Sequence, residues 1–271
     1  MYLTRHQTDR GPRWAVDNRF LPDTFDLRLL LSLHVDSVHE FLNSSVTNEK
    51  AIGVLLPPIE ALHEVWGAGV TYQRSREARR AESNLSDIYE RVYAAERPEV
   101  FFKMVGWRVV GHHMPIRIRE DSTWSVPEPE LTLVINRYRE VVGYCAGNDM
   151  SSRSIEGENP LYLPQAKIYN GSCAIGPGLE LIDPDRLYDM PIVLEIARVG
   201  RSVFRGETNS SKMNRRFDEL IACLNRELDF PHGVFLMTGT GVVPPDHFTL
   251  AIGDRVTITI GSLTLENEVG A

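Results

Sequence analysis

Residues 127–135 read Pro127-Glu-Pro-Glu-Leu-Thr-Leu-Val-Ile135, so two carboxylates precede a run of aliphatic and β-branched residues. Such a run is typical of a β-strand. Because side chains two positions apart on a strand point to the same face, Glu128 and Glu130 can converge on one point. A third carboxylate, Asp149, ends a second strand-like run that begins at Val141. A short turn at residues 137–140 would bring these two runs side by side.

Three carboxylates at adjacent strand ends repel one another unless a cation joins them. An all-oxygen ligand set of this kind suits Mg²⁺, Mn²⁺ or Ca²⁺. The spacing alone leaves a second interpretation open, in which the two glutamates are a solvated strand start and Asp149 caps a turn. The segment 155–171 favours the metal site, since it is rich in Pro and Gly yet carries two tyrosines, Gln165 and Lys167, as functional loops often do.

The bulk composition restricts the class of protein. A chain of 271 residues with 42% hydrophobic residues can form one large domain, or one large domain with a small N-terminal attachment. Its net charge of -8 disfavours nucleic acid as a partner, although a bound cation could still attract an anionic substrate. Three cysteines without Cys-x-x-Cys spacing indicate reduced thiols and a cytoplasmic location. Neither a signal peptide nor a membrane-spanning stretch is expected.

The distribution of elements predicts an α+β fold built on a curled, mostly antiparallel β-sheet with a few flanking helices. We expect a small N-terminal domain over residues 1–62, with a helix at 35–42 and a strand at 52–56, and a catalytic domain over 63–271. Apolar periodicity predicts two further helices, at 74–96 and 211–228. The predicted strands of the larger domain are 65–70, 100–103, 116–118, 131–135, 141–146, 192–197, 202–204, 255–260 and 263–268.

With these motifs in view, the chain resembles the fumarylacetoacetate hydrolase superfamily from about residue 64 to residue 268. The superfamily's Glu-x-Glu motif and its later Asp, in a Gly-x-Asp-x-Ser-x-Arg context, are matched by Glu128, Glu130 and Asp149. The Lys that follows is matched by Lys167, and a late Thr-Gly-Thr turn by residues 238–240. The resemblance implies a β-roll fold, a divalent metal held by the three carboxylates, a small 2-keto acid substrate and a homo-oligomer, either dimer or tetramer.

Within the superfamily, residues 97–103, 124–130 and 158–167 look more like the 2-keto-3-deoxy-D-arabinonate dehydratase branch than like the hydrolases. Hydrolases and decarboxylases carry a His-x-x-Glu pair after a Gly-x-x-Tyr segment, and here Ser75 and Ala78 stand at those positions. Without that His no base is evident for activating a water. The resemblance therefore implies dehydration of a 2-keto-3-deoxy sugar acid to 2-oxoglutarate semialdehyde. The alternatives are an acylpyruvate hydrolase or oxaloacetate-type decarboxylase on the same metal platform, and a binding protein that lost its activity.

Lys167 is the first candidate for proton transfer or enolate stabilisation, and a salt bridge to a metal carboxylate is its alternative role. Glu77 and His113 are the other candidate catalytic groups. His112 and His113 would face opposite ways on a strand, so at most one of them would enter the site. The candidate substrate-binding residues are Tyr72, Arg76, Gln165 and Thr240. For Arg76, a solvated charge on a helix is the alternative.

Overall fold

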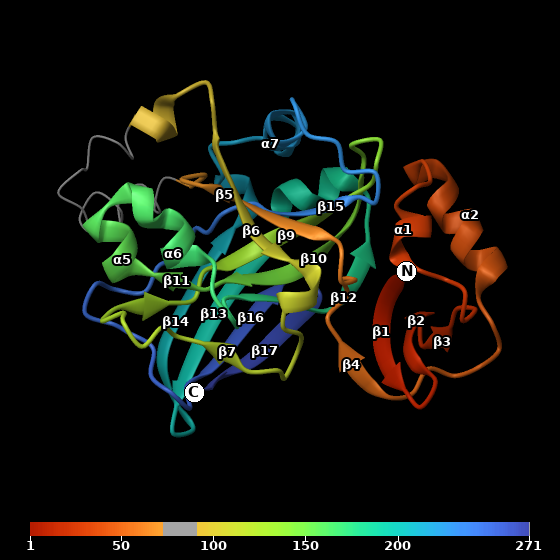
Figure 1. The fold of residues 1–271 in the computed structure, drawn as a ribbon, viewed down its shortest axis with the longest axis horizontal. Helices are drawn as coiled ribbons and strands as arrows, with labels where there is room; N and C mark the ends of the chain where they lie inside the picture. Colours follow the sequence, from red (N-terminus) through yellow and green to blue (C-terminus); the bar gives the residue numbers. More distant parts are fainter. Residues whose placement is uncertain (73–90, 271) are drawn as a thin grey trace.

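The computed structural model describes residues 1–72 and 91–270, and two β-sheets dominate it (Figure 1). The larger sheet runs in the order β3-β2-β1-β12-β10-β9-β15-β5-β6, and β4 pairs with β1. Its strands are β1 (Tyr2–Thr8), β2 (Gly11–Val16), β3 (Arg19–Phe20), β4 (Val54–Leu56), β5 (Glu64–Gly69), β6 (Glu99–Val105), β9 (Pro129–Ile135), β10 (Val141–Asp149), β12 (Cys173–Leu181) and β15 (Val234–Met237).

The smaller sheet has the order β14-β13-β16-β17-β7. Its strands are β7 (Ile116–Arg117), β13 (Pro191–Arg198), β14 (Arg201–Asn209), β16 (Arg255–Ile260) and β17 (Leu263–Gly270), and a separate pair joins β8 (Ser125–Val126) to β11 (Ser151–Ser152). The described helices with named bounds are α1 (Leu27–Leu30), α2 (Val35–Ser45), α5 (Arg153–Glu158), α6 (Leu163–Lys167) and α7 (Phe217–Leu224). None of them is long and apolar enough to cross a membrane.

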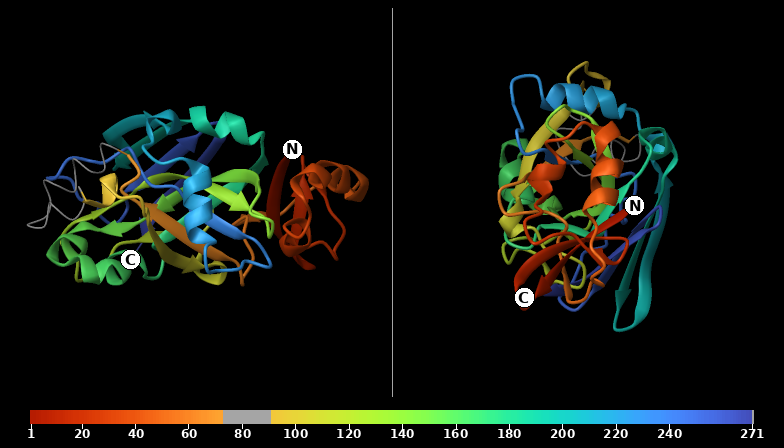
Figure 2. Two further views of the ribbon diagram at one scale, coloured as in Figure 1. Left: turned by 90° about the horizontal axis from the view of Figure 1, so that it is seen from above. Right: turned by 90° about the vertical axis from the view of Figure 1, so that its right-hand side faces the viewer.

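Strand β9 is buried on both faces, and its alternating side chains belong to two different cores. Leu131, Leu133 and Ile135 pack in the core that also holds residues of β13, β16 and β17. Val134, from the opposite face, packs in the core that contains the apolar side chains of α1 and α2. The central strands are thus held from both sides, which fixes the positions of their ends. Figure 2 shows β1–β3, α1 and α2 gathered at one end of the molecule.

The α+β fold with mostly antiparallel sheets is confirmed, and most predicted strands are present with shifted ends. Strands β1, β2, β12 and β15 were not predicted. Strand β12 contains Gly176, Pro177 and Gly178, and residues of these types usually mark turns. Strand β1 pairs with β12, so the first residues of the chain extend the larger sheet.

The prediction of one helix over 211–228 is wrong in its extent. Asn209 accepts a hydrogen bond from Ser211 N–H, but it caps only a short 3-10 turn over Ser210–Lys212. Arg216 then has an extended backbone, and α7 begins at Phe217. The apolar face predicted for this helix is confirmed, since Phe217, Leu220, Ile221 and Leu224 are buried. The helix predicted at 74–96 falls largely on residues 73–90, outside the described part of the chain.

His63 links two segments that are far apart in the sequence. It lies immediately before β5 and its side chain is almost fully buried. Its Nδ1 accepts a hydrogen bond from the backbone N–H of Glu60 at 3.3 Å, so the neutral ring donates from Nε2 to the carbonyl oxygen of His232 at 3.1 Å. Burial lowers the pKa of His63 below its ordinary value of 6.5, against an opposing effect of Glu60.

This lowered pKa predicts a pH-dependent stability. Below about pH 6.5 the unfolded chain binds a proton at residue 63 while the folded ring stays neutral, so the unfolding free energy should fall as the pH drops, by up to about 1.4 kcal/mol per pH unit. We expect His63→Gln to show a shallower slope between pH 7 and pH 5 in urea unfolding. His39→Gln, at an exposed position on α2, is the matched control. Equal slopes for wild type and His63→Gln would contradict this role.

Candidate functional site

The pairing of β9 with β10 brings the three predicted carboxylates together. The two strands are antiparallel with Glu130 opposite Gly147, and the N–H of Asp149 donates to the carbonyl oxygen of Glu128 at 3.0 Å. Glu128, Glu130 and Asp149 each offer a carboxylate oxygen, and these atoms lie within 4.8 Å of one another. All three side chains are buried. The predicted convergence of these residues is therefore present in the structure.

The Thr238-Gly239-Thr240 turn holds Glu130. It follows β15, which lies between β9 and β5, and the N–H of Gly239 donates to Glu130 Oε2 at 2.6 Å. Gly239 has a φ of +90°, and a Cβ at this position would clash with Oγ1 of Thr71, so only glycine fits here. Burial, together with the charges of Asp149 and Glu128, raises the pKa of Glu130 well above its ordinary value.

Three buried cations surround the cluster. Lys167 Nζ donates to Glu128 Oε2 and Asp149 Oδ2, both at 2.7 Å, and to Ser151 Oγ at 2.6 Å. Arg153, at the start of α5, donates to Glu128 Oε1 at 2.6 Å. Lys103, from β6, forms an ion pair with Asp149 Oδ1. Three carboxylates thus face three cationic side chains, which offsets much of their mutual repulsion.

Lys103 also fixes the backbone around the cluster. It is completely buried, and Nζ donates to the carbonyl oxygens of Met150 (3.1 Å) and Lys167. Lys167 is the last residue of α6, so Lys103 holds the end of that helix as well as Asp149. Positions 150 and 167 are thereby tied to the edge strand β6 by a single ammonium group.

The donor set fits a divalent cation. Carboxylate oxygens are hard ligands, and each carries a lone pair beyond the one used by its protein donor. A cation among them would favour the charged form of Glu130, which burial and the charges of Asp149 and Glu128 disfavour. The adjoining space has a volume of about 10 Å³, close to the least that holds one water. Glu99, Phe101 and Thr240 also line it.

The other predicted site residues have different placements. Tyr72 is buried, and burial together with the negative charge of Glu130 raises its pKa, so it lies close to the cluster. Thr240 lines the space, but its hydroxyl is engaged with the backbone of Val242 at 3.1 and 3.2 Å. Gln165 is exposed on α6 and does not line the space, and its role stays a prediction. Ser75, Arg76 and Glu77 lie outside the described residues.

His113 does not line the space beside Glu128, Glu130 and Asp149. Its side chain is 66% exposed, and Nδ1 lies 3.5 Å from Glu266 Oε1. The expectation that His112 and His113 face opposite ways is wrong, because the ring centroids are 3.7 Å apart. The two residues lie in a turn before β7, not in a strand, and His113 has a φ of +62°.

Sequence reasoning missed three charged residues at the site: Glu99, Lys103 and Arg153. Glu99 and Lys103 stand at the start and in the middle of an otherwise apolar strand, which is an unusual place for a charge. Arg153 closes the run that begins at Gly147 and is 2% exposed. The presence of a lysine within an otherwise apolar strand is the sequence feature that could have identified Lys103 as a site residue.

Comparisons with known proteins agree with this site. Residues 64–270 match the family model described as fumarylacetoacetate (FAA) hydrolase C-terminal. The chain is 48% identical over 217 residues to a probable 2-keto-3-deoxyxylonate dehydratase of Haloferax volcanii, covering 78% of this chain and 73% of that protein. It is 45% identical over 206 residues to the 2-dehydro-3-deoxy-D-arabinonate dehydratase of Saccharolobus solfataricus, covering 74% and 69%.

A solved structure is also similar over its whole length. It is a 2-keto-3-deoxy-D-arabinonate dehydratase complexed with magnesium and 2,5-dioxopentanoate. Its TM-score with this chain is 0.83 at 35% identity, and the match covers 100% of this chain and 99% of that one.

The charge balance around Asp149 predicts the effect of Lys103→Met. Losing one cation from a buried cluster should lower the unfolding free energy of the metal-free protein by about 3 to 5 kcal/mol. Added Mg²⁺ should restore more stability to this variant than to wild type, since a divalent cation replaces the missing charge. Urea unfolding with EDTA or with Mg²⁺ measures both effects. Lys212→Met, at an exposed lysine, is the control, and an equal Mg²⁺ effect in Lys103→Met and wild type would contradict the expectation.

Proposed function

The chain belongs to the fumarylacetoacetate hydrolase family, and we propose that it is a metal-dependent hydro-lyase that converts a 2-keto-3-deoxypentonate to 2,5-dioxopentanoate, the semialdehyde of 2-oxoglutarate. Support comes chiefly from one observation: the buried cluster of Glu128, Glu130 and Asp149 lies in a chain 45–48% identical to two dehydratases of such sugar acids. A divalent cation bound at the cluster supplies Lewis acidity toward the keto and carboxylate oxygens of a 2-keto acid.

The reaction balances as a loss of one water. A proton leaves C3, the hydroxyl group leaves C4, and a later shift of a C5 proton produces the aldehyde. The protein must therefore provide an acceptor for the C3 proton and a donor that stabilises the enolate or assists the departing hydroxyl.

We assign the donor role to Lys167 and the acceptor role to Glu99. The Lys167 ammonium lines the space beside the cluster, and its three N–H groups donate to Glu128, Asp149 and Ser151. A divalent cation that bound the oxygens of Glu128 and Asp149 would release N–H groups of Lys167, which could then donate to a substrate oxygen. Glu99 lines the same space from the start of β6, opposite the glycine at position 69. Tyr72 lies near Glu130 and can position the substrate beside these groups.

The remaining predictions concern the molecule as a whole. We propose a cytoplasmic homo-oligomer, dimer or tetramer, in which residues 1–62 form a small unit beside the catalytic domain. The free thiols of Cys145, Cys173 and Cys223 support a reducing compartment.

Product analysis tests the proposed reaction. With Mg²⁺, the protein should convert 2-keto-3-deoxypentonate to a product lighter by one water that reacts as an aldehyde, while leaving acylpyruvates intact. EDTA should abolish the reaction and Mg²⁺ or Mn²⁺ should restore it, and Glu130→Gln should lose activity while remaining folded. Cleavage of an acylpyruvate at a comparable rate would show that the protein is a hydrolase and not a dehydratase. Full activity in EDTA would exclude the metal-dependent mechanism.

Lys167→Met separates a chemical role from a structural one. If Lys167 donates to the reacting oxygen, turnover should fall by ~10² to 10⁴, with a much smaller change in the Mn²⁺ dissociation constant measured by electron paramagnetic resonance. Lys212→Met should behave as wild type. A loss of Mn²⁺ binding large enough to explain the whole defect would instead assign Lys167 to the salt bridge alone.

A further inference from the structure

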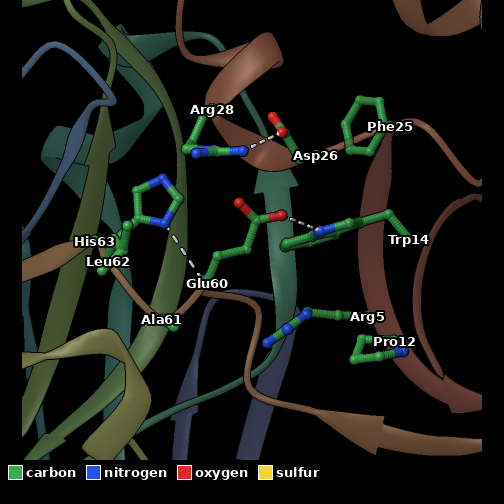
Figure 3. Close-up of a pocket in the computed structure, with 10 residues that line it drawn as sticks. All are labelled: Arg5, Pro12, Trp14, Phe25, Asp26, Arg28, Glu60, Ala61, Leu62 and His63. Carbon is green, nitrogen blue, oxygen red and sulfur yellow. Dashed lines mark hydrogen bonds and ion pairs between the residues drawn. The ribbon is translucent and has the colours of Figure 1, made fainter.

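A second cavity lies in the N-terminal part of the molecule (Figure 3). Its volume is about 400 Å³, which is within the usual range of small-molecule sites. The lining comes from β1 and β2, from the residues around α1, and from residues 60–63 just before β5. In the described part of the chain it shares no lining residue with the space beside the carboxylate cluster.

The carboxylates of this cavity are partly occupied by protein donors. Glu60 Oε1 accepts hydrogen bonds from Trp14 Nε1 and from the N–H of Leu27, both at 2.8 Å. Asp26 accepts from the N–H of Leu29 at 2.8 Å and from Arg28 at 2.7 Å. Within residues 1–72 and 91–270, no group donates to the second oxygen of Glu60. That oxygen can therefore accept a hydrogen bond from a ligand.

Among the described residues that line the cavity, Arg5 is the cation that forms no ion pair. Its guanidinium has five N–H donors, and the single bond that it makes to the described residues is to the carbonyl oxygen of Ile59, at 2.7 Å. The side chain is half-buried, and no carboxylate among the described residues forms an ion pair with it. In Figure 3, Glu60 lies between Arg5 and Arg28, and Arg28 is already paired with Asp26.

An apolar wall completes the cavity. The rings of Trp14 and Phe25 meet edge to face with centroids 6.3 Å apart, and both side chains are at most 9% exposed. On the opposite side, His63 is neutral and both of its nitrogens are engaged, so it offers no charge to a ligand. Within the described part of the chain, the cavity thus combines a guanidinium that has no carboxylate partner, a carboxylate oxygen that accepts no hydrogen bond and an aromatic surface.

We propose that this cavity binds a small polyhydroxylated carboxylate, the chemical class of the sugar acids. The guanidinium of Arg5 forms paired hydrogen bonds with the ligand's carboxylate. Glu60 accepts a hydrogen bond from a ligand hydroxyl, and the C–H groups of the ligand pack on Trp14 and Phe25. A carboxylate without hydroxyls would leave Glu60 facing the anion with no donor between them, and a neutral polyol would leave Arg5 without its anion.

Isothermal titration calorimetry of the full chain with three probes tests this site. D-gluconate carries both groups, butyrate carries only the carboxylate and sorbitol carries only hydroxyls. EDTA in the buffer prevents a cation at the carboxylate cluster from recruiting gluconate. We expect gluconate to bind at least about tenfold more tightly than either butyrate or sorbitol, since each lacks one charge-assisted hydrogen-bonding partner.

Arg5→Gln should weaken gluconate binding by about tenfold or more, and Arg5→Lys should weaken it less, because it keeps the charge but loses the paired geometry. Arg10→Gln, at an exposed arginine of the same region that pairs with Asp23 and Glu49, is the matched control and should match wild type. Thermal melts establish that each variant is folded.

Three results would overturn the site. Gluconate binding unchanged in Arg5→Gln would place the ligand elsewhere, equal affinity for butyrate and gluconate would reject the polyhydroxylated class, and no heat with any probe would reject the site itself. Each outcome can occur with the dehydratase activity intact or absent, so it is distinguishable from a failure of the proposed function.

Discussion

The interaction on which the site depends is the repulsion among three carboxylates buried within 4.8 Å of one another. Buried like charges cannot all stay ionised without partners. The protein provides Lys103, Lys167 and Arg153, and each of them is at most 2% exposed. This balance lets the cluster form before a metal arrives. It also limits how strongly a divalent cation is held, because the cation must share oxygens that already have cationic partners.

Much of the surrounding fold keeps this balance in place. Both faces of β9 are buried in separate cores, so the strand that carries Glu130 cannot shift without exposing apolar side chains on one face or the other. The turn after β15 adds a backbone N–H to Glu130, and Thr71 donates to the carbonyl oxygen of Thr238 to hold that turn. Precision in the carboxylate positions therefore comes from sheet packing and backbone hydrogen bonds more than from the carboxylates themselves.

The sequence predicts those parts of the site that depend on local geometry. Glu128 and Glu130 share a face because of the two-residue period of a strand. The position of Asp149 beside them follows from the hairpin that pairs β9 with β10. Lys103 could not be assigned in this way, since its contact with Asp149 depends on strand order. Strand β15, more than a hundred residues later in the chain, inserts between β9 and β5 and sets how β6 lies relative to β10. Strand β12 was missed for a different reason. Its glycines and proline predict a turn, and the strand forms because it pairs with β1 on one side and β10 on the other, which its own sequence does not reveal.

The N-terminal cavity and the space beside the carboxylate cluster differ in how their charges are used. At the carboxylate cluster, cations and anions are matched within the protein, and a ligand must enter a network that is already paired. In the N-terminal cavity, Arg5 makes a single hydrogen bond to the described residues, at Ile59, while Glu60 is held by Trp14 and Leu27. A paired network favours exact placement of a reacting group, whereas an unpaired guanidinium favours capture of an anion. Strand β5 runs between them, since His63 immediately precedes it and Gly69 at its end lines the space beside the cluster. One short strand thus joins a region suited to binding with a region suited to chemistry.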